Sequence, residues 1–210
     1  MVFSIRDPRR LPWCLNGGAN LGIRSSRMEN YMMRLPGTKQ PTLKPQDLFV
    51  VLKIAVSGEA TPSFAQLSRE MSMSASEAHA AVQRSITSHL LSREGSCVVV
   101  NRASLREFII HGVRYAFPGV SGPVTRGMPT GASAPPLQQH FGQSNNLPQV
   151  WPDAEGHVRG VSFCPLYPSV PAACRQDDRL YRALVLVDAL RGGAAREREF
   201  AMNALTAALN

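Results

Sequence analysis

The sequence lacks a long hydrophobic run. Its longest apolar stretch, residues 48–56, is interrupted by Lys53 and has half of the roughly 18 residues that a membrane-spanning helix requires. Near the N-terminus, Arg6, Arg9 and Arg10 are followed by no apolar segment long enough for a secretory signal. We therefore expect a cytoplasmic protein that has no membrane partner.

Cysteine is scarce as well. The four cysteines include no C-x-x-C pair and are too few for a disulfide framework in a chain of 210 residues. We expect reduced thiols, in agreement with the cytoplasm. The cysteines are Cys14, Cys97, Cys164 and Cys174.

Motifs for catalysis and metal binding are missing. The sequence holds no P-loop, no Rossmann glycine fingerprint, no H-E-x-x-H pair and no G-x-S-x-G elbow. His157, Cys164 and Cys174 lack the short paired spacing of zinc ligands. In the glycine-bearing segment 124–131, Arg126 could hold an anion, but a hydrogen bond to a backbone carbonyl is the favoured role. We expect no enzyme, no catalytic residue, no metal site and no cofactor.

The charge that is present is basic and uneven. The net charge of +8 and the pI near 9.9 suggest an anionic partner. Residues 1–41 hold seven basic residues against Asp7 and Glu29, which gives them +5 and leaves +3 for the rest. Residues 1–41 also lack helical or strand periodicity. They are predicted to be a loose basic arm, functional or the product of a misannotated start site, since Met28, Met32 and Met33 lie within them.

Helical patterns begin after residue 41. Apolar residues recur with helical spacing over residues 45–56. A short helix ending near Met71 begins either at Thr61 or at Ser63. Ser74-Ala75-Ser76-Glu77 matches a capping box and predicts a helix of about five turns to Leu91.

A hairpin and a further helix follow. Residues 93–96 form a turn, and Cys97-Val98-Val99-Val100 is a β-branched run that pairs with the residues before the turn. Asn101 is expected to cap a helix that ends before Pro118.

The composition of the chain changes after residue 117. Residues 118–176 hold 10 Pro and 7 Gly, a composition typical of irregular chain. Large apolar residues from Trp151 onward favour partial order. A helical hairpin broken at Gly192-Gly193 ends the chain.

These patterns predict a mainly α-helical fold. It combines a winged helix-turn-helix domain that has a short β-hairpin with an irregular Pro/Gly-rich segment and a C-terminal helical hairpin. The predicted divisions are residues 1–41, 42–117, 118–176 and 177–210.

Residues 64–78, Phe-Ala-Gln-Leu-Ser-Arg-Glu-Met-Ser-Met-Ser-Ala-Ser-Glu-Ala, resemble the helix-turn-helix of MarR-type winged-helix regulators. The sequence departs from that pattern at Ser68, where alanine is usual, and at Ser72, where glycine usually makes a left-handed turn. Residues 101–171 look like the remainder of an uncharacterised bacterial group that shares the domain. The resemblance implies DNA binding and dimerisation.

If the domain binds DNA, the helix from Ser74 lies in the major groove. Gln83 and Arg84 could then reach base edges, and Ser74 and Ser76 suit phosphate contacts at the helix N-terminus. Arg93 lies at the hairpin tip. The predicted DNA-binding residues are Ser74, Ser76, Gln83, Arg84, Thr87 and Arg93.

Two functions remain open at this stage. The first is a sequence-specific DNA-binding transcriptional regulator, expected to be a homodimer because two half-sites multiply a modest affinity for double-stranded DNA. The second is a protein-interaction adaptor or antitoxin-like protein, whose partner binds the helix-turn-helix and residues 118–210.

Overall fold

A computed structural model describes residues 42–58, 62–95, 97–141 and 147–209. The chain divides after residue 40, and its second unit, residues 41–210, is compact. All described residues lie in the second unit, and the predicted basic arm, residues 1–41, lies outside them. The predicted divisions at 117/118 and 176/177 fall inside the second unit, where a single hydrophobic core runs from Leu48 to Leu209.

Helix α2(Pro45–Val56) forms as predicted and lies deep in this core. Pro45 occupies the first turn, where its missing N–H costs no hydrogen bond. Asp47 accepts a hydrogen bond from the backbone N–H of Lys44 at 2.8 Å, which caps the helix. Every residue from Asp47 to Ala55 is buried, so α2 contacts other elements on all sides.

Helices α3(Phe64–Glu70) and α4(Ala75–Thr87) follow, joined by a four-residue turn. Ser63 caps α3 by accepting a hydrogen bond from the backbone N–H of Gln66 at 3.2 Å, which settles the start of this helix. Ser72 adopts a left-handed φ of 49°, the conformation expected at the glycine-like position of the turn. Helix α4 is one turn shorter than predicted because His89, with a φ of 59°, turns the chain into the next strand.

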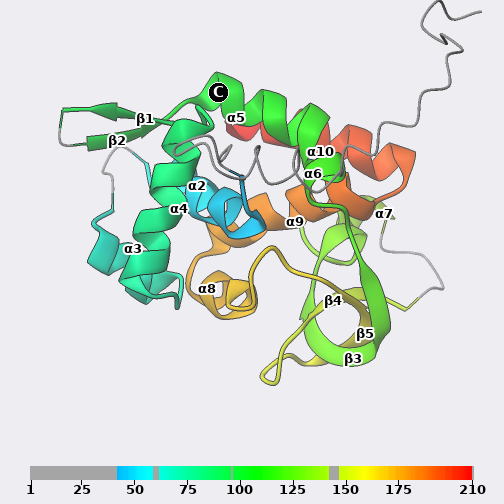
Figure 1. The fold of residues 1–210 in the computed structure, drawn as a ribbon. Coiled ribbons are helices and arrows are strands. Elements are labelled where there is room, and N and C mark those ends of the chain that lie inside the picture. Colours follow the sequence, from blue (N-terminus) through cyan, green and yellow to red (C-terminus); the bar gives the residue numbers. More distant parts are fainter. Residues whose placement is uncertain (1–41, 59–61, 96, 142–146, 210) are drawn as a thin grey trace, which may run out of the picture. The chain divides into compact units, whose positions relative to one another are not determined.

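The predicted hairpin consists of β1(Leu91–Glu94) and β2(Cys97–Val100), paired antiparallel. Asn101 caps α5(Arg102–Glu107) as expected, by accepting from the backbone N–H of Ser104 at 3.1 Å. The chain continues through a π-helical turn, η1(Phe108–Gly112), into α6(Val113–Ala116). Figure 1 shows the hairpin beyond the C-terminal end of α4.

The prediction of an irregular Pro/Gly-rich segment is wrong for most of residues 118–176. Strands β3(Ser121–Pro129), β4(Gln149–Pro152) and β5(Val158–Phe163) form a closed three-stranded sheet (Figure 1). Strand β3 pairs antiparallel with both neighbours, and β4 pairs parallel with β5. Two short helical pieces, η2(Gly131–Ser133) and α7(Gln138–Phe141), lie between β3 and β4.

The glycines of this segment permit its tight closure. A Cβ on Gly127 would lie 1.9 Å from the backbone oxygen of Trp151, and one on Gly160 would lie 2.1 Å from the oxygen of Pro148. No side chain fits at either position, so the glycine content reflects close strand contact.

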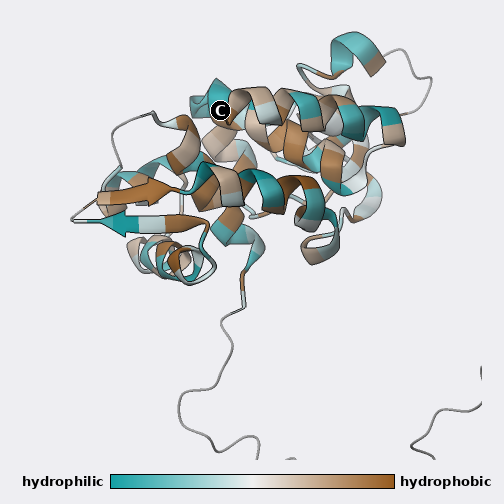
Figure 2. Cartoon of the chain, turned by 90° about the horizontal axis from the view of Figure 1, so that it is seen from above, coloured by the Kyte–Doolittle hydropathy of each residue, from teal (hydrophilic) through white to brown (hydrophobic). Residues whose placement is uncertain are grey.

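The C-terminal helices are α8(Val170–Gln176), α9(Asp178–Gly192) and α10(Ala195–Ala208). The expected hairpin of α9 and α10 is present, but α9 lies in the interior: all residues from Leu184 to Arg191 are buried. Residues 184–191 are therefore covered within the chain, and the binding of a partner by the rest of residues 118–210 stays a prediction. The helices in Figure 2 carry bands of hydrophobic and hydrophilic residues, as helices with one face on a core do.

A buried polar network joins α9 to the closed sheet. Asp188 accepts hydrogen bonds from Thr130 at 2.8 Å and from the indole N–H of Trp151 at 2.6 Å. Its other oxygen pairs with Arg191 at 2.6 Å, and Arg191 also donates to the carbonyl of Phe117 at 2.8 Å. Burial raises the pKa of Asp188, while Arg191 and the two neutral donors oppose that rise.

Candidate nucleic-acid interface

Helix α4 has one buried face and one exposed polar face. Ala78, Ala81, Val82 and Ser85 lie against the core. On the opposite side, Ser76, His79 and Thr87 are exposed, and Gln83 is half-buried. Their spacing of three and four residues places these four side chains along a single stripe.

The N-terminus of α4 is occupied by its own cap. The hydroxyl of Ser74 accepts from the backbone N–H of Glu77 at 3.2 Å, and the carboxylate of Glu77 accepts from the backbone N–H of Ser74 at 3.2 Å and its hydroxyl at 2.8 Å. Hydrogen bonds from Ser74, and then from Tyr167, lower the pKa of Glu77. The carboxylate of Glu77 therefore occupies the position at the helix N-terminus where an external anion could bind.

The cap bears on two of the predicted residues. Ser74 was expected to donate to a phosphate, but its hydroxyl and backbone N–H already donate to Glu77. Ser76 is exposed, and its hydroxyl lies 3.1 Å from that of Ser74. The donors of Ser74 are therefore occupied by Glu77, which corrects the phosphate role predicted for Ser74, while the phosphate contact predicted for Ser76 stays a prediction.

Arg84 is also corrected. Its Nε and Nη2 donate to the two carboxylate oxygens of Asp47 at 2.8 and 2.5 Å. Asp47 is fully buried in α2, and the side chain of Arg84 is 21% exposed. Because this fork-to-carboxylate pair neutralises a buried charge, Arg84 holds α4 onto α2 and is not free to contact a base.

The segment after β5 reaches the turn between α3 and α4. Tyr167 donates from its hydroxyl to Glu77 at 3.0 Å and stacks on Phe49 with ring centroids 6.3 Å apart. Ser169 donates to the backbone oxygen of Met71. This segment therefore stabilises the turn and the capped end of α4.

The elements before and after α4 in the chain each carry an exposed arginine. Arg69 is exposed in the last turn of α3, and Arg93 is exposed on β1. His79 stands edge-on to the ring of Phe64, with centroids 5.1 Å apart. Sequence reasoning missed Arg69 and His79, although His79 lies three residues after Ser76 and four before Gln83, which is the helical spacing of one face.

The structure also bears on Arg126, on metal ligands and on membrane-spanning helices. Arg126 donates from Nε to the carbonyl oxygen of Gly156, which confirms the structural role predicted for it, although it lies on a strand. Within the described residues, no group of three or more His, Cys, Asp or Glu side chains could hold a metal ion. No helix in that same part of the chain is long and apolar enough to span a bilayer.

Comparisons with other proteins add no assignment: no protein-family model, no curated protein and no solved structure matches this chain.

Proposed function

We propose that the chain binds double-stranded DNA through α3, α4 and the β1–β2 hairpin, which together act as a winged helix-turn-helix, and that it is a sequence-specific transcriptional regulator. The observation that carries this proposal is the exposed polar stripe of α4, formed by Ser76, His79, Gln83 and Thr87. It lies on a helix that follows a short turn and precedes an exposed hairpin.

The dimensions of α4 suit the major groove. Its 13 residues extend over about 20 Å, and the groove is about 12 Å wide, enough to admit a helix. Gln83 can pair with adenine through its amide, and His79 can donate to a purine acceptor. These two side chains are the proposed readers of base sequence.

Phosphate contacts come from the flanks of the helix in this proposal. Arg69 on α3 and Arg93 on β1 are exposed on the elements before and after α4. Since so few side chains face the bases, we propose that two copies bind adjacent half-sites as a homodimer. Light scattering on the free chain and on its DNA complex measures that stoichiometry.

The test is fluorescence anisotropy of the full chain with DNA from its own upstream region and with a scrambled duplex, at low and near-physiological salt. Gln83→Ala is expected to weaken binding to the native DNA by about 1–3 kcal/mol and to leave the scrambled DNA unaffected. Arg93→Gln should weaken both, and Arg196→Gln on α10 serves as the matched control. Equal affinity for the two duplexes that is lost at the higher salt contradicts the proposal.

A second function is favoured by four apolar side chains that are exposed between residues 115 and 147. Tyr115, Val120, Val124 and Leu147 are 75%, 58%, 44% and 55% exposed. A protein-interaction adaptor would use such residues, and the exposed stripe of α4 carries no charged side chain. If no DNA preference is found, Val120→Glu and Val124→Glu should abolish the binding of a protein partner.

A further inference from the structure

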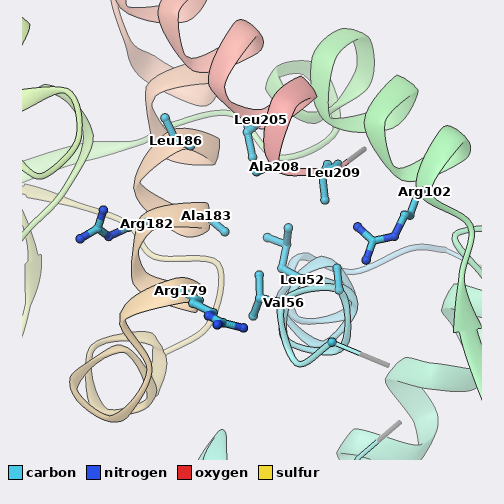
Figure 3. Close-up of a pocket in the computed structure, with 12 residues that line it drawn as sticks. Leu52, Val56, Arg102, Arg179, Arg182, Ala183, Leu186, Leu205, Ala208 and Leu209 are labelled. Carbon is cyan, nitrogen blue, oxygen red and sulfur yellow. The ribbon is translucent and has the colours of Figure 1, made fainter. Parts of the chain in front are cut away.

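A pocket of about 410 Å³ lies between α2, α5, α9 and α10. Its size falls within the range of small-molecule sites, roughly 300–1,000 Å³. It lies apart from the exposed stripe of α4, none of whose residues line it. Figure 3 shows that its walls come from helices at both ends of the described chain.

The lining is apolar on three sides. Leu52 and Val56 come from α2, Ala183 and Leu186 from α9, and Leu209 follows α10. Val56 and Ala183 are half-buried, so part of this apolar surface is exposed to solvent. An apolar ligand group placed there would remove this surface from water, which favours binding.

The polar part of the lining is cationic. Arg102 from α5 and Arg179 from α9 approach the pocket from opposite sides, and both side chains point toward it (Figure 3). Among the described residues, neither side chain has an ion-pair partner. Arg182 also lines the pocket, but its guanidinium pairs with Asp178 at 2.8 Å. Among the residues that the structure describes, none that lines the pocket is acidic, so the described part of the lining is cationic.

We propose that this pocket binds a small amphipathic anion, a single carboxylate carried on an apolar body. Arg102 and Arg179 would hold the carboxylate, because guanidinium groups match its planar geometry. The leucines and Val56 would contact the apolar body.

The chemistry of the lining sets the ligand preference. A neutral molecule of the same length makes the apolar contacts but leaves both arginines without a partner. A cationic amphiphile is repelled. The two arginines therefore favour an amphiphile that ends in a carboxylate over one that ends in an alcohol.

The test is isothermal titration calorimetry of the full chain with decanoate and with decanol. At low salt, the affinity for decanoate is expected to be at least about tenfold higher than the affinity for decanol, because decanoate forms one or more charge-assisted hydrogen bonds that decanol lacks. In Arg102→Gln/Arg179→Gln the two should bind alike. Arg196→Gln, which removes an exposed arginine of α10 outside the pocket, should keep the full preference.

A second variant tests the apolar part. Ala183→Phe fills the pocket and should weaken both decanoate and decanol, with circular dichroism checking that the helices are retained. Equal affinity for decanoate and decanol in the unaltered chain overturns the proposal. So does a preference for decanoate that survives in Arg102→Gln/Arg179→Gln, because the charge recognition would then lie elsewhere.

Discussion

Replacing Arg84 tests whether this residue serves the fold. In Arg84→Met, the carboxylate of Asp47 loses two hydrogen bonds, at 2.8 and 2.5 Å, and its counter-charge. Asp47 is completely buried, so water cannot replace what is lost. We expect the free energy of unfolding to fall and the affinity for DNA per folded molecule to stay the same.

The expected magnitude follows from the burial of the pair. Breaking a buried ion pair by removing one partner costs about 3–5 kcal/mol. Arg84 is 21% exposed, and Asp47 retains the hydrogen bond from the backbone N–H of Lys44 at 2.8 Å. Both features place the loss at the lower end, about 3 kcal/mol, which is a large part of a typical stability of about 5–15 kcal/mol.

Urea unfolding of the full chain, followed by circular dichroism, measures this loss. Arg182→Met breaks an exposed pair with Asp178 and should cost less than about 1 kcal/mol. The double variant Asp47→Leu/Arg84→Met removes both charges and should recover part of the stability. If Arg84→Met unfolds like the unaltered chain and loses specific DNA binding, Arg84 reads bases and the structural role is refuted.

Two other predictions concern buried charges. Burial acts to raise the pKa of Asp177, but hydrogen bonds from Lys53 and from the backbone N–H of Leu180 outweigh it and lower the pKa below its ordinary value of 3.8. The hydrogen bond from Lys53 also lowers the pKa of Glu70 below its ordinary value of 4.5. At a pH above these ordinary values, both ionised carboxylates increase the free energy of unfolding, and this contribution is lost as the pH falls below about 4. Urea titrations at several pH values should show a smaller acid-induced loss of stability in Lys53→Met than in the unaltered chain. Asp188→Asn leaves Arg191 buried without a counter-charge and should lower the free energy of unfolding by about 3–5 kcal/mol; a change under about 1 kcal/mol would show that the carbonyl of Phe117 and the other acceptors suffice.

Local signals predicted the helical elements well. Ser63, Ser74 and Asn101 each cap the helix predicted from them, because a capping hydrogen bond depends on residues three apart in the chain. The hairpin also followed from neighbouring residues. Such features can be derived from sequence because their partners are adjacent.

The closed sheet was missed because the Pro and Gly content of residues 118–176 was interpreted as a sign of irregular chain, whereas the glycines allow close contact between strands. Gly127 and Gly160 look like flexible residues, yet both are required by strands that lie too close for a Cβ. The strand pairing joins segments up to 42 residues apart, as between Ser121 and Phe163. No local pattern in the segment indicates that pairing.

The candidate interface was predicted only in part. The helical face containing Ser76, Gln83 and Thr87 follows from periodicity. The role of Arg84 depends on Asp47, 37 residues earlier, and helical spacing alone does not show which arginine has a buried partner. His79 was available from the same periodicity and was passed over.

The position of α2 has a consequence for the time course of synthesis. Lys53 on α2 pairs with Asp177 at 2.7 Å, across 124 residues of chain. At elongation rates of about 5–20 residues per second, these partners are made roughly 6–25 seconds apart. During that interval α4 has been made but α9 has not, so the face of α2 that packs on α9 stays uncovered on a ribosome-bound chain until α9 has been translated.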